Sequence, residues 1–432
     1  MLCLTSYRVD VDGRDVGDDG AHYTLLTRNG GIVRTSSDEY LELNSRRTSS
    51  FSADKLSKWK ELGLLVDDSI DELSDVLREN NNASKDSTEL YLPILPSTAC
   101  QLGCGYCGQT HTSTGPHQNL SDGILQYLIE SFRSGDYKTV RFGLFGAEPF
   151  LAFQWLIAFG RKLESFRRVF PEALISSKAV SNGVSATKER VTRLVDEIGL
   201  DTIEITLDGL PHVHNVQRSS KNGRDYYKNI VENILALREV RDVELIIRCN
   251  VGSESFEHVP AFIDFLTSRS LQDYATLYFA PIHSWGNRAH LMALQAEEYA
   301  LRELSWKLQL WNYGWKVGFL PRRKKITCLA LRRDGVIVAP TGDLFDCSEM
   351  PLVPMYKSRA IGHISEGSVA DRMPRSFATF NDEILNGKLP CSSCFALPVC
   401  GGACPKEWAE GRIPCPSFKH NAEYALTAWL KT

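Results

Sequence analysis

The sequence predicts an α/β fold, in which a partial (β/α)6 TIM-like barrel lies between a small N-terminal α+β domain and a cysteine-rich C-terminal domain. Strand and helix patterns alternate six times from Leu90 onward, and all of the 12 cysteines except Cys3 and Cys249 fall into two groups. The 432 residues are 43% hydrophobic and 24% charged, which is typical of a globular chain with a large core. The net charge of −4 gives no overall field that would attract nucleic acid or an anionic membrane.

The first part of the chain has the pattern of a small α+β domain. The alternating hydrophobic runs 22–26 and 31–33 are separated by Asn29 and Gly30, a pair that favours the tight turn of a β-hairpin. Residues 52–62 then carry a helical pattern of apolar positions. The polar stretch ENNNASKDSTE that follows this domain nearly lacks apolar residues and is predicted to be a linker.

The middle of the chain alternates hydrophobic strand patterns with amphipathic helices. Such β-then-α units favour a parallel sheet with right-handed crossovers, closed or partly closed into a barrel, with the chemistry at the C-terminal ends of the strands. The predicted strands are 90–95, 139–145, 174–180, 202–207, 243–251 and 275–282. The predicted helices between them include 121–132, 187–198, 226–237 and 256–266.

From about Arg322 the regular pattern stops, and Gly, Pro and Cys dominate the sequence. Such a segment has difficulty burying a core of its own, and metal sites would supply the missing folding energy. The basic run that begins at Arg322 and ends at Lys325 is predicted to be solvated surface, with contact to an acidic peptide or to a cluster as the alternative. The predicted parts are an N-terminal domain 1–78, a linker 79–89, a barrel 90–315 and a C-terminal domain 316–432.

The first cysteine group, Cys100-x3-Cys104-x2-Cys107, follows the first barrel strand directly. Three thiolates can hold three irons of a [4Fe–4S] cluster and leave the fourth iron open to a substrate or cofactor. A structural zinc ion is the alternative, although it normally takes four ligands. The position of the three cysteines at the mouth of a barrel favours the cluster.

The second group contains seven cysteines near the C-terminus. No secretory signal and no apolar run of about 18 residues occur in the sequence, so we expect a reducing, cytoplasmic protein without a membrane span. Close cysteine spacing in that compartment indicates metal binding rather than disulfides. Two zinc sites are the alternative, and they would need eight ligands. The group comprises Cys328, Cys347, Cys391, Cys394, Cys400, Cys404 and Cys415.

The segment LPSTACQLGCGYC resembles the radical S-adenosylmethionine (SAM) enzymes, in which an aromatic residue precedes the third cysteine. Three later segments at strand ends are similar to motifs of that family. They are Phe145-Gly146-Ala147-Glu148-Pro149, Ser181-Asn182-Gly183 and Thr206-Leu207-Asp208-Gly209, and Ala147 stands where the family has a second glycine. The resemblance implies that SAM is held by Gly146, Glu148, Asn182, Thr206 and Arg218, and that the motif containing Gly146 and Glu148 binds the SAM amino group.

The C-terminal cysteines are similar to those of a complete SPASM domain, which binds two auxiliary [4Fe–4S] clusters. The resemblance implies three clusters in all, with Cys328, Cys347 and Cys404 on the auxiliary cluster nearer the barrel. It assigns the distal cluster to Cys391, Cys394, Cys400 and Cys415. The nearer cluster then has three cysteine ligands, and its fourth site would be open, filled by a non-cysteine side chain, or available to substrate.

The resemblance implies an oxidoreductase that cleaves SAM to a 5′-deoxyadenosyl radical, which abstracts hydrogen from a residue of a ribosomal precursor peptide. A cross-link or another oxidative modification would result. The N-terminal domain loosely resembles the winged-helix element that captures leader peptides, and flavodoxin or ferredoxin would supply electrons. A sulfatase-type formylglycine maturase is one alternative, and an Fe–S electron carrier or a degenerate binding module is another. No catalytic base can be named, since Asp208, Asp343 and Asp346 are only carboxylates near the expected sites.

Overall fold

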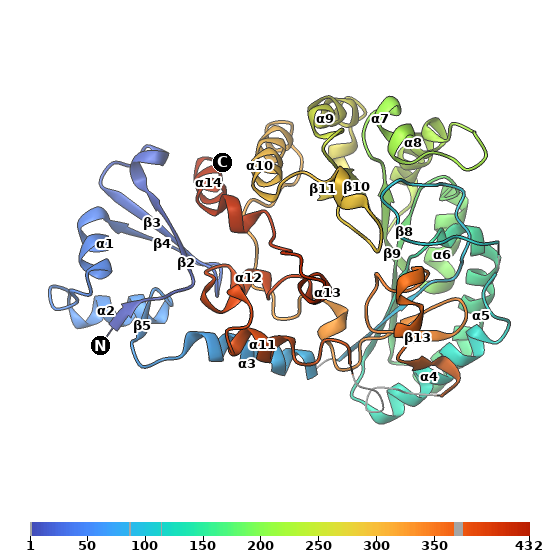
Figure 1. Cartoon of the computed structure of the whole chain (residues 1–432), viewed down its shortest axis with the longest axis horizontal. Helices are drawn as coiled ribbons and strands as arrows, with labels where there is room; N and C mark the ends of the chain where they lie inside the picture. The colour runs from blue at the N-terminus through green and yellow to red at the C-terminus, as the bar shows by residue number, and fades with distance from the viewer. Residues whose placement is uncertain (1, 86–87, 114, 367–374) are drawn as a thin grey trace.

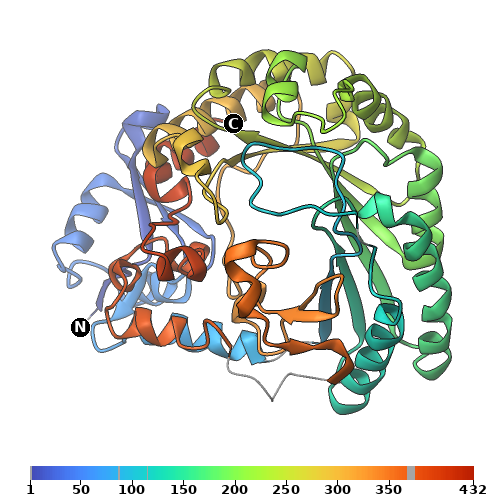
Figure 2. The same ribbon diagram turned by 45° about the vertical axis from the view of Figure 1, so that its right-hand side comes forward.

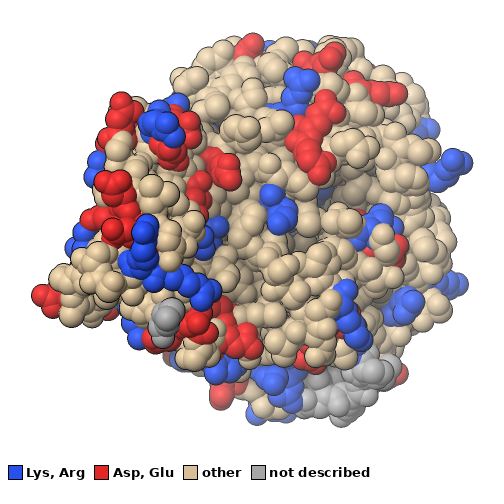
Figure 3. All heavy atoms as spheres, turned by 60° about the vertical axis from the view of Figure 1, so that its left-hand side comes forward, with Lys and Arg blue, Asp and Glu red and all other residues tan. Residues whose placement is uncertain are grey.

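The computed structural model describes residues 2–85, 88–113, 115–366 and 375–432. The N-terminal unit lies at one end of the molecule, the barrel at the other, and the cysteine-rich C-terminal segment between them (Figure 1). On the face shown in Figure 3, basic and acidic side chains are interspersed rather than separated by sign. Within the described residues, the helices are too short or too polar to cross a membrane.

The barrel strands are parallel and follow one another in chain order. Their six predicted positions are confirmed to within two residues, and each strand pairs with the next. Because all six run in the same direction, their C-terminal ends meet at one edge of the sheet. The strands are β6 (Glu89–Ile94), β7 (Thr139–Leu144), β8 (Leu174–Ser181), β9 (Leu200–Thr206), β10 (Glu244–Val251) and β11 (Ala275–Pro281).

Helices cover the outer face of this sheet, and the interior of the curved sheet faces the C-terminal segment (Figure 2). The four predicted helices are confirmed as α4 (Leu120–Ser134), α6 (Lys188–Ile198), α8 (Tyr227–Ala236) and α9 (Val259–Thr267). The predicted ranges did not include α5 (Phe153–Val169) and α10 (Ala296–Asn312). In α5, Gly160 lowers helix propensity, but it permits close packing, because a Cβ there would lie 2.9 Å from the backbone oxygen of Glu197.

The C-terminal segment continues the barrel sheet, although its sequence predicted no regular structure. Val338 of β12 (Ile337–Val338) pairs with Ile94 of β6, and the amide of Leu95 donates to the carbonyl of Val338 across 2.9 Å. Strands β13 (Asp343–Phe345) and β14 (Gly362–His363) follow, giving a nine-stranded sheet. The segment also buries apolar side chains, among them Ile337, Phe345, Met350, Val353 and Tyr356. The prediction failed because two- and three-residue strands are too short to show a period.

The linker predicted for residues 79–89 is wrong over its first part, because α3 (Glu72–Lys85) continues through it. Its polar residues bind other parts of the chain instead of facing only water. Asn80 accepts a hydrogen bond from Arg323 at 2.7 Å, and Asn81 accepts one from Asn381 at 2.6 Å. Arg323 was predicted to be solvated with the rest of the basic run, but it lies at the interface between α3 and the C-terminal domain. Residues 86 and 87 of the predicted linker lie outside the described residues.

The N-terminal unit contains a three-stranded antiparallel sheet, β2 (Arg8–Asp12), β3 (Ala21–Leu26) and β4 (Ile32–Ser36). The hairpin predicted at Asn29 and Gly30 is confirmed, and Gly30 has a φ of +77°. The helix predicted at 52–62 is confirmed as α2 (Ala53–Glu61). The other elements of this unit are β1 (Leu2–Leu4), α1 (Ser37–Asn44) and β5 (Leu65–Asp67).

The remaining helices belong to the rest of the chain. They are α7 (Pro211–Gln217) in the barrel, and α11 (Phe380–Leu385), α12 (Leu397–Cys400), α13 (Pro405–Ala409) and α14 (Phe418–Lys431) in the C-terminal segment.

Candidate active site and cysteine groups

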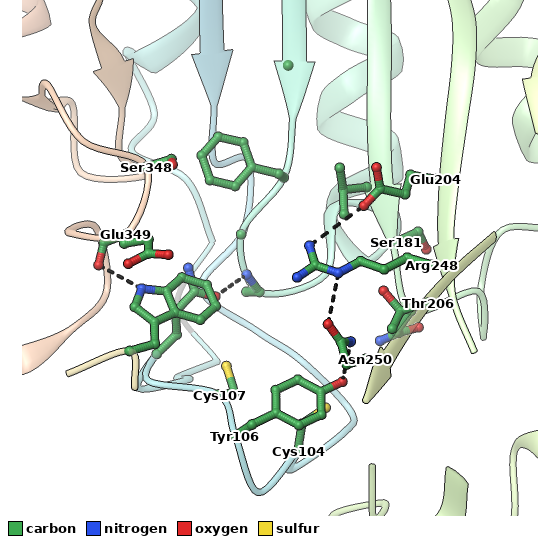
Figure 4. Close-up of a pocket in the computed structure, with 18 of the residues that line it drawn as sticks. Cys104, Tyr106, Cys107, Ser181, Glu204, Thr206, Arg248, Asn250, Ser348 and Glu349 are labelled. Atoms are coloured by element: carbon green, nitrogen blue, oxygen red, sulfur yellow. Dashed lines mark hydrogen bonds and ion pairs between the residues drawn. The ribbon is translucent and has the colours of Figure 1, made fainter. Parts of the chain in front are cut away.

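A cavity of about 500 Å³ opens at the C-terminal ends of the barrel strands. Cys100, Cys104 and Cys107 line it on one side, in the loop that follows β6. Cys328 and Glu349, from the C-terminal domain, line it on the other. The two cysteine groups of the sequence therefore meet across one cavity, as Figure 4 shows for the labelled residues Cys104, Cys107 and Glu349.

The cysteine loop is held by backbone hydrogen bonds to the last residue of α7 and to the segment that follows it. The amide of Gly103 donates to the carbonyl of Ser219 across 2.7 Å, and that of Gly105 donates to Gln217 across 3.0 Å. Burial raises the pKa of the Cys100 thiol to about 11, because a thiolate loses its hydration there. Bound iron would favour the thiolate form, so this set of buried soft donors fits an Fe–S cluster.

Tyr106, within the cysteine loop, is the centre of a buried polar network (Figure 4). Its hydroxyl donates to Asp208 at 2.5 Å and accepts hydrogen bonds from Arg218 at 2.6 Å and from Asn250 at 3.0 Å. Burial raises the pKa of Tyr106, which keeps this phenol protonated and able to donate. The network joins the cysteine loop to the ends of β9 and β10, and it positions the guanidinium of Arg218 at the cavity.

Four of the five predicted SAM-binding residues line the cavity: Gly146, Asn182, Thr206 and Arg218. The amide nitrogen Nδ2 of Asn182 lies 3.6 Å from the sulfur of Cys100, so this turn is next to the cysteine loop. Gly146 has a φ of +79°, and a Cβ there would lie 2.4 Å from the side chain of Leu95. Only glycine fits this close approach at the cavity edge.

Glu148, the fifth residue predicted to bind SAM, is not among the residues that line the cavity. Glu148 is fully buried and lies behind the cavity wall rather than in it. Its carboxylate accepts hydrogen bonds from the backbone amide of Asn182 at 2.8 Å, from the Ser181 hydroxyl at 2.9 Å and from the amide of Phe150 at 3.0 Å. Through the hydrogen bond to the Asn182 amide, Glu148 positions the turn that carries Asn182.

The seven C-terminal cysteines lie in two places in the fold. Cys391, Cys394, Cys400 and Cys415 surround a separate small cavity of about 20 Å³. Burial raises the pKa of Cys391, and the other three cysteines raise it further, to about 12. Four thiols around one small cavity fit an Fe–S cluster. Among the residues that the structure describes, no three His, Cys, Asp or Glu side chains are arranged to hold a single metal ion.

Cys328, Cys347 and Cys404 form the other C-terminal group, next to the barrel cavity. Burial raises the pKa of the Cys347 thiol, and the neighbouring Cys328, Glu349 and Cys404 raise it further. The negative charge of the Glu349 carboxylate raises the pKa of all three cysteines.

Glu349 belongs to a charged group that the sequence analysis missed. It pairs with His283 at 2.9 Å and with the buried Lys406 at 2.9 Å. Although burial opposes its ionisation, His283 and Lys406 lower the pKa of Glu349 to about 2. The only signal in the sequence is the position of Glu349 two residues after Cys347. His283 and Lys406 are far from it in the chain and come together only in the folded protein.

The chain was compared with protein-family models and with solved structures. Residues 94–266 match the family model described as the Radical SAM superfamily. The structure of polyhistidine-tagged anSMEcpe with bound AdoMet superposes with a TM-score of 0.59 at 17% identity, covering 79% of this chain and 96% of that chain. The structure of Streptococcus suis SuiB bound to the precursor peptide SuiA superposes with a TM-score of 0.52 at 14% identity, covering 96% of this chain and 99% of that chain. Residues 94–266 therefore form a Radical SAM domain, and the chain as a whole has a fold similar to those of anSMEcpe and SuiB.

Proposed function

We propose that this protein is a radical SAM/SPASM maturase that oxidatively modifies a residue of a ribosomal precursor peptide. The observation that carries the proposal is the single cavity shared by Cys100, Cys104 and Cys107 with Cys328 of the C-terminal domain. A substrate residue in that cavity would lie between the two cysteine groups, so it could lose a hydrogen atom to the 5′-deoxyadenosyl radical at one side, and an electron to the auxiliary cluster at the other with release of a proton. A cross-link or a related loss of two hydrogens is the expected product.

The roles of the cavity residues follow from their positions. Cys100, Cys104 and Cys107 hold the [4Fe–4S] cluster that a radical SAM domain requires, and Asn182 lies beside them to bind AdoMet. Thr206 and Arg218 offer a hydroxyl and a guanidinium to the polar groups of AdoMet, and Gly146 lets AdoMet approach the backbone. When bound, the cluster and AdoMet supply one-electron hydrogen abstraction from an unreactive carbon.

Two auxiliary [4Fe–4S] clusters complete the proposed enzyme. Cys391, Cys394, Cys400 and Cys415 hold the distal one, since they surround their own cavity. Cys328, Cys347 and Cys404 hold the one beside the active site. Electrons enter from a flavodoxin or ferredoxin in the reducing cytoplasm, where exposed clusters and thiols survive.

The peptide substrate is proposed from the N-terminal unit and from the solved structures. SuiB, crystallised with its precursor peptide SuiA, matches 96% of this chain, including residues before the barrel. The anSMEcpe structure with bound AdoMet and the Cp18Cys peptide matches 79%. Strand β4 is at the edge of the N-terminal sheet, where a leader segment could add as a further strand through main-chain hydrogen bonds.

The experiment uses anaerobically reconstituted protein, AdoMet and dithionite, with 5′-deoxyadenosine measured by liquid chromatography. We expect 5′-deoxyadenosine from the native protein and none from Cys104→Ser, while Cys3→Ser behaves as native. Co-expression with short peptides encoded beside the gene, read by mass spectrometry, should show a loss of 2 Da. Absence of 5′-deoxyadenosine with every peptide would favour an electron carrier, and a product only on a sulfatase-derived peptide would favour the formylglycine maturase.

A further inference from the structure

The floor of the active-site cavity carries more positive than negative charge. Lys178, Glu204 and Arg248 project from β8, β9 and β10 into the barrel and line the cavity. Glu204 accepts a hydrogen bond from Lys178 at 2.7 Å, and Arg248 lies 3.8 Å from its other oxygen. Among the described residues on this floor, two cations therefore face one carboxylate.

The hydrogen-bonding capacity of Arg248 is only partly used. Its Nε–H donates to the side chain of Asn250 at 2.9 Å, and its terminal nitrogens approach Glu204 and Tyr278 on the floor side. One third of the side chain is exposed, although it lies inside the barrel, so that exposed surface faces the cavity. Figure 4 shows the guanidinium extending between Glu204 and Asn250 into the open space.

The other charges that line the cavity are already balanced. Arg218 lies 3.9 Å from Asp208 and bonds to Tyr106, and His283 pairs with Glu349. His111 is neutral near pH 7, since burial and Lys221 lower its pKa to about 4. The net positive charge of the described cavity lining is therefore concentrated at Lys178 and Arg248. An unbalanced guanidinium inside a cavity is costly unless a ligand supplies the anion.

We propose that Arg248 and Lys178 form a subsite for a carboxylate of the peptide substrate, which orients the residue to be modified. This proposal rests on the proposed peptide-maturase function and names the recognition that the function needs. A guanidinium presents paired N–H donors that match the two oxygens of a carboxylate. The carboxylate comes from an Asp or Glu side chain of the peptide. The C-terminus of the peptide and the carboxylate of AdoMet are two other sources, which the test distinguishes from a side chain.

The test measures binding of defined peptides to reconstituted holoenzyme with AdoMet, by isothermal titration calorimetry. The probes are acetylated, amidated Gly/Ser heptapeptides with a central Glu or a central Gln, and a third probe with a central Gln and a free C-terminus. We expect the Glu peptide to bind at least 10-fold more tightly than the Gln amide. Equal binding of the amidated Glu and Gln peptides overturns the proposal. Tighter binding of the peptide with the free C-terminus than of the Glu peptide assigns the subsite to a chain end and overturns the side-chain assignment.

Four variants test whether the preference for the Glu peptide depends on the charged residues of the cavity floor. Arg248→Gln should reduce the Glu preference to less than 2-fold, whereas Arg248→Lys should retain part of it. Glu204→Gln removes the competing carboxylate and should strengthen Glu-peptide binding, which is a gain that misfolding does not produce. Lys221→Gln, which changes an exposed cation beside His111, should leave the preference as in the native protein.

Two further measurements separate this proposal from the function on which it rests. AdoMet affinity without peptide should change less than 2-fold in Arg248→Gln, and a 10-fold loss would assign Arg248 to AdoMet and overturn the subsite. Formation of 5′-deoxyadenosine by the native protein tests the proposed function separately. A native enzyme that forms 5′-deoxyadenosine but does not distinguish Glu from Gln refutes the subsite and leaves the function in place.

Discussion

The backbone amide of Asn182 donates to the buried carboxylate of Glu148 across 2.8 Å, so a side chain after β7 positions the turn after β8. Glu148→Gln replaces one acceptor oxygen with an amide group that repels the N–H of Asn182. We expect AdoMet affinity to fall about 10-fold, because an unsatisfied buried group costs about 1–3 kcal/mol. Calorimetry with AdoMet is the measurement. Glu189→Gln, on the exposed first turn of α6, is the control, and native affinity in Glu148→Gln would contradict the positioning role.

Gly146→Ala tests the close packing at the cavity edge. The change adds a methyl group 2.4 Å from Leu95 at a φ of +79°. Gly223→Ala is a matched control, because Gly223 has a φ of +74° and open space around it. Backbone strain alone costs about 1 kcal/mol, so we expect a small decrease in melting temperature for Gly223→Ala and a larger one, with weaker AdoMet binding, for Gly146→Ala. Equal decreases would show that the contact with Leu95 is irrelevant.

Tyr106→Phe removes the hydroxyl that joins Asp208, Arg218 and Asn250. The cysteines are unchanged, so we expect native iron content. AdoMet affinity should fall about 10-fold, since loss of a hydrogen bond to a charged group costs roughly 1.5–3 kcal/mol. Tyr137→Phe, which loses a hydrogen bond to Asp334 away from the cavity, should bind AdoMet as the native protein does. Iron loss in Tyr106→Phe would mean that the network supports the cluster instead.

Cys391→Ala tests the four-cysteine group. Because Cys391 faces the small cavity with three other cysteines, its removal should lower iron content by up to one cluster while AdoMet binding persists. Iron and sulfide analysis with electron paramagnetic resonance provides the measurement. Cys3→Ala, in the N-terminal unit, should leave both values unchanged. An unaltered iron content in Cys391→Ala would remove this residue from the ligand set.

Acidification should weaken the contact between α3 and the C-terminal domain. Burial raises the pKa of Glu79, but Arg28 and Arg323 lower it more strongly, so the folded pKa lies below the usual 4.5. A depressed carboxylate pKa stabilises the fold above the unfolded pKa, and this contribution disappears as pH falls through the folded pKa. Glu79→Gln should therefore lower the melting temperature at pH 7 and have a smaller effect near pH 4. A constant difference across that range would contradict this linkage.

The sequence predicted the elements that are specified by a local, regular pattern of residues along the chain. The barrel strands and the hairpin at Asn29 belong to this class. Helix α3 beyond residue 78 does not, because its polar residues are stabilised by Arg323 and Asn381, both distant in sequence. Polarity alone could not distinguish a linker from a helix at an interface.

The candidate site shows the same division. The first three cysteines and four of the five predicted AdoMet residues lie at the cavity, since strand ends converge in any parallel barrel. The orientation of Glu148 depends on hydrogen bonds from another strand end, which a motif does not specify. The pairs His283–Glu349 and Lys178–Glu204 join distant elements, so only the folded chain reveals them.

The pairing of Val338 with Ile94 makes the C-terminal segment the neighbour of the first barrel strand. A chain shortened at residue 316 would leave the backbone of β6 without that neighbour, and an uncovered strand of this kind attracts other chains. We therefore expect the barrel to aggregate when it is produced without the C-terminal segment, even with its three cysteines intact. During synthesis its sheet also stays incomplete until residues 337 and 338 have been made, so the cysteine-rich segment takes part in the folding of the barrel that precedes it.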